Sequence, residues 1–279
     1  MDVNDECSHW NRVSNYWAFL GPPLKPGPED IEVMLSAAAR HRASVEGHAY
    51  RVVLWGVTPE IAAMVWPGGT ELLAIDHAEK MIESVWPGDK PGFRRAVCGK
   101  WSETARISGG SCDLIIGDGS LGCVRYPTEF RELTKTARES LRKGGLLILR
   151  LHAGPEIKEE PAAVVEDLLN LQIDNFHIFK FRFAMALQES PEEGVELHEI
   201  WKKWTTLDID ERELAVKTGW DLRVIRTIEL YRDREDRYAF PSLNQHLGIF
   251  RDHFSLVDIH VPDYEMGSRR PIVFLSRGS

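Results

Sequence analysis

Residues 52–64 read VVLWGVTPEIAAM, an apolar run that meets a single glycine and then a helix start. Val52, Val53 and Leu54 favour a strand, because β-branched and apolar side chains suit a pleated, buried surface. Thr58 is a suitable N-cap, and Pro59 suits the first position of a helix. A dinucleotide-binding loop would carry three glycines here, whereas this loop carries only Gly56. The stretch therefore predicts a strand–turn–helix unit that binds a different ligand.

Strand-like and helix-like runs alternate after this unit, and alternation of this kind favours a sheet with helices on both faces. The runs at 113–117 and 145–151 are almost wholly apolar, as is typical of parallel strands that are buried on both faces. The predicted strands are 51–55, 71–76, 96–98, 113–117, 145–151, 254–261 and 271–276, the last two as a hairpin. The predicted intervening helices are 59–65, 78–85 and 127–142. We expect an α/β fold with a doubly wound, mostly parallel, seven-stranded, Rossmann-like sheet.

Two helical regions are expected to flank this core. A proline-rich connector at 21–28 separates aromatic helix 9–20 from helix 29–41. Residues 175–187 alternate like a strand at first and end like a helix; we favour a helix. Further helices are expected at 160–172, 195–204, 210–218 and 242–253. The expected domains are a helical lid at 1–45, a core at 46–174, a helical insertion at 175–240, and a final helix and strands at 241–279.

Composition restricts the function classes. The chain has 279 residues and a net charge of −9, which disfavours a nucleic-acid partner. No apolar run reaches the roughly 18 residues that span a bilayer, and the acidic N-terminus lacks a signal-peptide core, so we expect a cytoplasmic protein. The four cysteines form no CxxC pair, and the ten histidines show no HExxH spacing, so no metal is expected. A small-molecule partner is favoured, and the oligomeric state is left open, a dimer included.

The Gly56 loop suits a ligand without a diphosphate. Glycine lets a ligand approach the backbone, but Pro59 offers no N–H and Glu60 adds negative charge, which disfavours phosphates. Asp76 ends the next strand, twenty residues after Gly56, where a carboxylate accepts the hydroxyls of a ribose. An N-cap for the following helix is the alternative role of Asp76. A nucleoside with a ribose diol and no diphosphate fits both features, and S-adenosylmethionine is one.

The order of segments resembles the class I S-adenosylmethionine-dependent methyltransferases. The matching segments cover roughly residues 50–151 and are VVLWGVTPEIA, LLAIDHAEKMI, VCGKWSE, CDLIIGDGSL and LRKGGLLILRL. The closing segments FSLVDIH and RPIVFLSR match the last two strands of that family. The chain departs from the family at residues 55–58, where Trp-Gly-Val-Thr replaces the usual glycine-rich loop.

The resemblance implies a set of cofactor contacts. Gly56 would border the methionine part, Asp76 would hold the ribose, and Asp118 could pair with the ammonium group. The remaining implied contacts are His77 and Met81 near the adenine, Lys100 and Trp101 at its edge, Gly119 and Ser120 at the methionine end, and Tyr16 closing over the cofactor. For Met81, Lys100, Trp101 and Tyr16 the alternative is ordinary packing or surface exposure.

Candidates for the acceptor site follow from the ends of strands. His152 comes directly after the fifth strand, and Tyr264 lies between the last two, so both are candidate catalytic residues; a structural role is the alternative for each. Asp118-Gly119-Ser120 differs from the Asn-Pro-Pro-Tyr motif of enzymes that methylate exocyclic amines, which favours a small-molecule or peptide acceptor. Two other functions stay open: an NAD-dependent oxidoreductase of similar fold, and a non-catalytic S-adenosylmethionine-binding protein.

Overall fold

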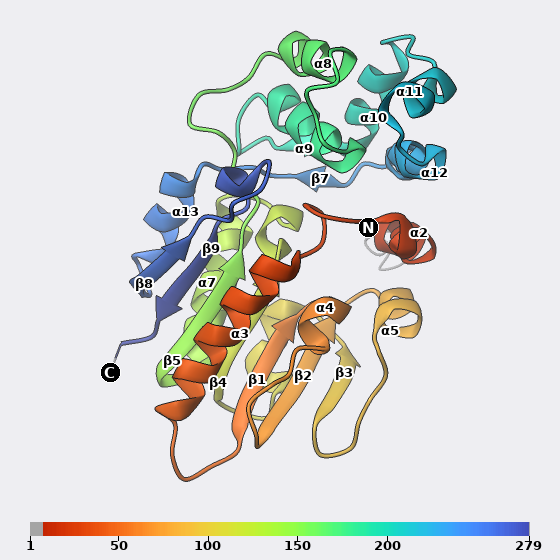
Figure 1. The fold of residues 1–279 in the computed structure, drawn as a ribbon. Helices are drawn as coiled ribbons and strands as arrows, with labels where there is room; N and C mark the ends of the chain where they lie inside the picture. Colours follow the sequence, from red (N-terminus) through yellow and green to blue (C-terminus); the bar gives the residue numbers. More distant parts are fainter. Residues whose placement is uncertain (1–7, 279) are drawn as a thin grey trace.

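The computed structural model describes residues 8–278, and its centre is a seven-stranded sheet in the order β3-β2-β1-β4-β5-β9-β8 (Figure 1). Of these strands β9 alone runs against its neighbours, since it pairs antiparallel with both β5 and β8. The predicted doubly wound, mostly parallel sheet is therefore confirmed, and so is the closing hairpin. The strands are β1 Tyr50–Trp55, β2 Thr70–Asp76, β3 Arg94–Cys98, β4 Cys112–Asp118, β5 Leu141–Arg150, β8 Ser255–His260 and β9 Ile272–Ser276.

The strand order reverses between β1 and β4. The chain steps outward from β1 to β2 and β3, and then returns to the other side of β1 with β4. Trp55 at the end of β1 pairs with Ile75 on one side and Gly117 on the other, so three carboxyl ends lie together. In open α/β sheets, ligands bind at this reversal, beyond the carboxyl ends of the strands.

Alternate residues of β1 enter different hydrophobic clusters on the two faces of the sheet. Val52 and Leu54 pack with α3 (Pro28–Ala43), α4 (Pro59–Ala62) and α5 (Glu79–Val85). Val53 and Trp55 pack on the other face with α7 (Thr128–Ser140) and α13 (Leu243–Phe250). Both faces are covered, which explains why the middle residues of β1, β4 and β5 form nearly continuous apolar runs.

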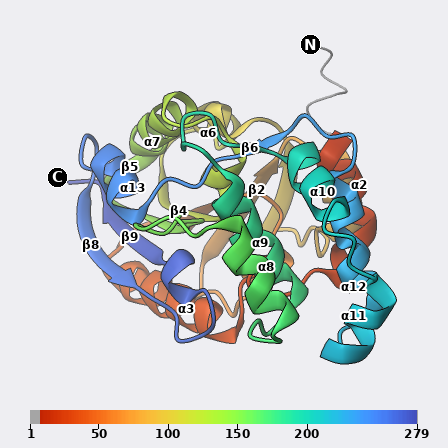
Figure 2. The same ribbon diagram turned by 90° about the horizontal axis from the view of Figure 1, so that it is seen from above.

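A helical cap, residues 161–238, lies over the carboxyl edge of the sheet (Figures 1 and 2). From above, α8 and α9 cross the edge, and α10 to α12 lie to one side beside α2. Its elements are α8 Pro161–Leu169, α9 Phe176–Leu187, β6 Val195–Glu196, α10 Leu197–Thr205, α11 Glu211–Thr218, α12 Leu222–Ile225, the 3₁₀ helix η4 Arg226–Tyr231, and β7 Arg237–Tyr238. Val164 and Leu168 of α8 share the buried cluster of this cap, so the helical layer begins before residue 175.

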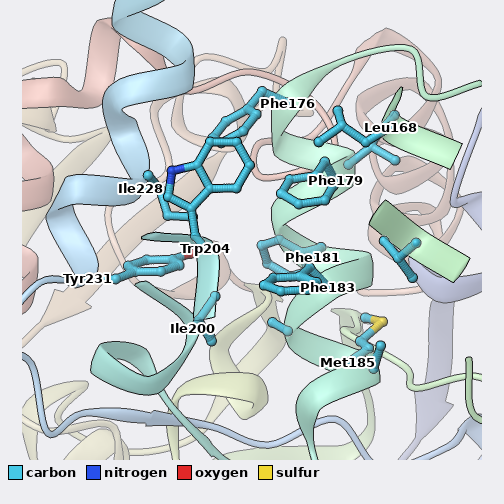
Figure 3. Close-up of a cluster of buried hydrophobic side chains, with 14 of the residues drawn as sticks. Leu168, Phe176, Phe179, Phe181, Phe183, Met185, Ile200, Trp204, Ile228 and Tyr231 are labelled. Carbon is cyan, nitrogen blue, oxygen red and sulfur yellow. The ribbon is translucent and has the colours of Figure 1, made fainter. Parts of the chain in front are cut away.

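The helix predicted at 175–187 is present as α9. Asn175 caps it, because its side chain accepts the backbone N–H groups of His177 and Ile178. Phe176 and Phe179 meet the ring of Trp204 edge to face, with centroids 5.3 Å and 5.4 Å away (Figure 3). Almost every side chain of α9 is buried, so the helix lacks the one-sided periodicity that identifies surface helices.

The N-terminal helix α2 (Ser8–Tyr16) continues into the 3₁₀ helix η1 (Trp17–Phe19). It contacts both α5 of the core and η4 of the cap, and Figure 1 shows it at the opening between these two parts. No helix in residues 8–278 is both long and apolar enough to cross a membrane.

Candidate active site

A cavity of about 630 Å³ lies between the carboxyl edge of the sheet, the cap and α2. The sequence-predicted residues that line it are Gly56, Asp76, His77, Met81, Lys100, Trp101, Asp118, Gly119, Ser120 and His152. Tyr16 and Tyr264 are not among its lining residues. The loops after five parallel strands thus converge on one space, as expected for a ligand site in this fold.

Gly56 and Asp76 face each other at this edge. Gly56 has a φ of +98°, and a Cβ at this position would lie 4.0 Å from Asp76 Oδ2. The other oxygen, Oδ1, accepts the N–H of Ala78 at 2.9 Å. This bond closes a turn before α5, whose N-cap is Ala78, so Asp76 is not the N-cap that the sequence left open as an alternative. The second oxygen of the carboxylate is turned toward the glycine backbone.

Burial is the main influence on the Asp76 carboxyl group. It raises the pKa of Asp76 to about 6, partly opposed by the Ala78 N–H and by the nearby His77. A buried carboxylate with a raised pKa and few partners gains from a ligand that donates hydrogen bonds to it.

Flat and apolar side chains form the wall beside Asp76. The Trp101 ring stacks on Trp55 with centroids 6.2 Å apart and planes at 21°, and its Nε1 donates to the Ile75 carbonyl at 2.8 Å. Met81 lines the same region and is buried. The side chain of Lys100 is exposed, and that of His77 is 30% exposed. This wall suits a planar, apolar group such as a purine.

Asp118 is held by two buried arginines. Its Oδ1 accepts Arg150 Nη1 at 2.5 Å and Arg270 Nη2 at 3.2 Å. Arg150 Nε also pairs with Asp30 of α3 at 3.1 Å. Burial lowers the pKa of Arg270 to about 9, with the charge of Arg150 acting in the same direction. An ammonium group at Asp118 would therefore meet a carboxylate whose charge two guanidinium groups already balance.

Tyr264 belongs to this buried network instead of the cavity wall. Its hydroxyl donates to Asp30 at 3.0 Å and lies 3.4 Å from Arg150 Nη2. The structure does not bring it together with His152 in an acceptor site, because the loop before β9 packs toward α3. The structure therefore places Tyr264 in this network and outside the cavity lining.

Tyr16 was predicted to close over the cofactor, but the structure places it outside the cavity lining. Its helix α2 does lie where the sequence predicted a lid. Tyr16 is 42% exposed, and its ring is next to that of Phe19. The cavity is lined instead by His9, Trp10, Val13 and Trp17. The spacing of residues 10, 13 and 17 is that of one helix face, and this signal could have identified the correct residues.

His152 forms part of the cavity wall below the cap. Its imidazole stacks on Phe240 at 6.4 Å and meets Phe181 edge-on at 4.8 Å. A Cβ on Gly119 would lie 2.2 Å from its Nε2, so a glycine at 119 is required by this packing. Burial, with the charges of Arg270 and Arg150, holds the pKa of His152 well below its usual value. The ring is neutral at physiological pH.

The cap contributes lining residues that no sequence pattern indicated: Lys180, Phe181, Leu230, Tyr231 and Tyr238. The outer opening carries exposed acidic side chains from α7 and the loops around β6 and β7: Glu132, Glu192, Glu193 and Glu235. In the described residues, no group of three or more His, Cys, Asp or Glu side chains is placed to hold a metal ion.

No protein-family model and no curated protein matches this sequence. Among solved structures, the chain is similar to the N-methyltransferase NodS from Bradyrhizobium japonicum WM9 in complex with S-adenosyl-L-homocysteine, with 9% identity, a TM-score of 0.51, and coverage of 99% of this chain and 100% of that one. The CcbJ methyltransferase from Streptomyces caelestis gives 12% identity, a TM-score of 0.54, and 99% and 100% coverage.

A third solved structure, from Rhodobacter sphaeroides, is described as "Putative Zn-dependent Alcohol Dehydrogenases" and gives 11% identity, a TM-score of 0.60, and full coverage of both chains. At these identities the likeness shows the fold alone. The chain has the fold found in class I S-adenosylmethionine-dependent methyltransferases, and the site must supply the argument for function.

Proposed function

We propose that the protein is an S-adenosylmethionine-dependent methyltransferase that acts on a small-molecule acceptor. The observation that carries this proposal is the position of Asp76. Its carboxylate lies across from the bare backbone of Gly56, at the strand reversal, inside a cavity that also receives the loop after β4.

The residues present fit the parts of S-adenosylmethionine. Asp76 would accept the ribose hydroxyls, the wall of Met81 and Trp101 would take the adenine, and the loop at 118–120 would border the methionine part. The side chain of Ser120 adds a buried hydroxyl without a hydrogen-bond partner in residues 8–278. The ribose and the adenine would thus each meet groups of matching chemistry.

A diphosphate fits poorly at the same place. Helix α4 begins with Pro59, which has no N–H to donate, and Glu60 of its first turn pairs with Lys25 at 3.7 Å. The first turn of α4 thus presents a carboxylate where a dinucleotide-binding loop presents free N–H groups. This disfavours the NAD-dependent oxidoreductase, despite the likeness to the protein described as an alcohol dehydrogenase.

When bound, S-adenosylmethionine supplies a methyl group activated by its positive sulfur. The chain would position the acceptor against that methyl group and exclude water with the cap and α2. Orienting two reactants contributes about 7–11 kcal/mol in well-placed systems, whereas a general base contributes ~10²–10⁴-fold. The neutral ring of His152 could hold an acceptor proton, but positioning is the larger effect.

Titration calorimetry tests the proposal. S-adenosylhomocysteine should bind with one site per chain, and NAD⁺ and NADH should give no heat of binding at the same concentrations. Tight binding of NAD⁺ without binding of S-adenosylhomocysteine would favour the oxidoreductase. Binding of S-adenosylhomocysteine without methyl transfer to any tested acceptor leaves the non-catalytic binding protein as the second function.

A further inference from the structure

Lys180 is a buried lysine at the inner side of the cavity. It lies on α9 between the aromatic residues of the cap cluster, and the whole residue is 2% exposed. Its side chain lines the same cavity as Asp76 and Asp118. Lysine is almost never fully buried unless it is paired, so its position calls for a partner.

The contacts of Lys180 leave its charge without a counter-ion. Nζ donates to Thr227 Oγ1 at 3.0 Å, and that hydroxyl donates to the Val224 carbonyl, so its lone pair faces the lysine. The ring of Tyr231 lies 4.9 Å from Nζ. No carboxylate of residues 8–278 lies within ion-pair distance of it. Thr227 and the ring occupy only part of the donor capacity of an ammonium group.

The titratable groups around Lys180 provide no negative charge. Burial lowers the pKa of His9 to about 4 and that of His177 to about 3, so both rings are neutral. Burial raises the pKa of Tyr231 and of Tyr238, which keeps both hydroxyls protonated. Asp236, which influences His9, is paired with Arg234 at 2.8 Å. Burial alone lowers the pKa of Lys180 to about 7.

None of the described acidic side chains that line the cavity is a counter-ion of Lys180. Asp76 and Asp118 lie on the sheet side, and Glu129 is bonded to Arg125 at 2.7 Å. The exposed glutamates of the outer opening are solvated, so their charges are screened. Asp236 also lines the cavity and is paired with Arg234, so among the described residues no acid of the cavity forms an ion pair with Lys180.

We infer that Lys180, held by Thr227, binds a carboxylate group of the methyl acceptor, whose apolar body packs on the aromatic residues around it. This inference rests on the proposed function and specifies its substrate class. Tyr231 contacts Lys180, and Trp10, Trp17 and Phe181 line the same cavity; these rings suit an aromatic or otherwise apolar body. The bound carboxylate supplies the counter-ion that the folded chain lacks.

Paired probes test the inference, each an aromatic acid with its neutral amide: 4-hydroxybenzoate with 4-hydroxybenzamide, phenylacetate with phenylacetamide, and indole-3-acetate with indole-3-acetamide. Each is titrated into the protein saturated with S-adenosylhomocysteine. At least one acid should bind roughly 30-fold or more tightly than its amide, the size expected when one partner of a buried charge pair is neutralised. If no acid binds better than its amide, the inference is overturned.

The variant Lys180→Met keeps the length of the side chain and removes its charge. It should bind the acid no better than the amide and keep the affinity of the wild type for S-adenosylhomocysteine within about threefold. Lys203→Met, on the exposed side of α10, is the matched control and should retain the preference for the acid. A preference that persists in Lys180→Met would contradict the inference. Failure of the wild type to bind S-adenosylhomocysteine would instead contradict the proposed function.

A second measurement needs no variant. At pH 8 much of Lys180 is neutral in the free protein, and a bound carboxylate should restore its proton. Titrations of the preferred acid in buffers of different ionisation enthalpy should show the uptake of most of one proton per site at pH 8. Binding of the acid without proton uptake would contradict a Lys180 that is largely neutral until a carboxylate supplies its counter-ion, even if Lys180→Met fails to fold.

Discussion

Asp76 Oδ2 lies 4.0 Å from the point where a side chain on Gly56 would begin, across the carboxyl ends of two paired parallel strands. This relationship places a glycine of the first loop, which lets a ligand approach the backbone, opposite a carboxylate that can accept hydroxyl groups. The proposal of a nucleoside ligand without a diphosphate depends on it.

Removing the Asp76 carboxylate should remove most of the affinity for S-adenosylhomocysteine. Two charge-assisted hydrogen bonds at ~1.5–3 kcal/mol each imply that Asp76→Ala binds about 10²–10⁴-fold more weakly. Glu71→Ala, at the exposed amino end of the same strand, should bind like the wild type. Calorimetry on both variants measures this, and a change below about threefold in Asp76→Ala would leave Asp76 with only its structural hydrogen bond to the Ala78 N–H.

The affinity for S-adenosylhomocysteine should depend on pH through Asp76. Because burial raises its pKa to about 6, the ligand-binding carboxylate form is lost as the pH falls below 6, and affinity should decline by up to about tenfold per pH unit there. Asp76→Asn should show weak binding that does not follow this profile. A wild-type affinity that is constant from pH 5 to pH 8 would argue against a role for the Asp76 charge.

The same group predicts an opposite effect on the stability of the free protein. The pKa is raised in the folded state, so the contribution of Asp76 to stability is full below about pH 3.8 and is lost as the pH rises through about 6. At pH 7.5 the Asp76→Asn variant should therefore be at least as stable as the wild type in urea denaturation. A large loss of stability would mean that the Ala78 hydrogen bond outweighs the cost of burying the charge.

Gly56→Ala should impair ligand binding more than folding. The positive φ costs about 1–2 kcal/mol for a residue with a Cβ, but the new methyl group meets no protein atom closer than 4.0 Å. Gly88→Ala carries the same backbone cost, since Gly88 has a φ of +85° with open space around it and lies outside the cavity lining. The two variants should have similar melting temperatures, and only Gly56→Ala should lose affinity. Equal affinities would show that no ligand approaches Gly56.

We expect Arg150 to be essential for holding the segment before α3, which contains Pro23 and Lys25, against the sheet. Its guanidinium binds Asp118 and Asp30 and donates to the carbonyls of Pro23 and Lys25. Arg150→Met leaves buried carboxylates without their partner, which typically costs about 3–5 kcal/mol. It should also expose the segment before α3 to limited proteolysis.

Arg131→Met is the control for Arg150, because Arg131 forms an exposed pair with Asp252. That pair is worth only about 0–1 kcal/mol. If the two variants unfold at the same urea concentration, the buried network does not hold the segment in place.

The sequence predicted those parts of the fold and of the site that depend only on residues close together along the chain. Gly56 directly follows a strand, and Asp76 and Asp118 each end one, so the strands themselves bring these residues to the carboxyl edge of the sheet. The side of the N-terminal helical segment that faces the cavity could have been predicted from the residues spaced along one helix face. That spacing gives Trp10 and Trp17 in place of Tyr16. The helix α9 was ambiguous because burial on all sides removes periodicity.

Other site residues depend on contacts between distant segments. The hydroxyl of Tyr264 binds Asp30, far earlier in the chain, and no local pattern encodes that contact. Lys180 meets Thr227 and Tyr231 only because the cap folds α9 against η4. The cap therefore carries the features of the proposed acceptor site that a single sequence does not reveal.

A crystal structure with S-adenosylhomocysteine bound tests the central claim most directly. The account predicts that both ribose hydroxyls contact the Asp76 carboxylate, that the adenine lies against Met81 and Trp101, and that the sulfur faces the inner part of the cavity that Lys180 lines. A ligand bound with its ribose away from Asp76, or outside this cavity, would contradict the account.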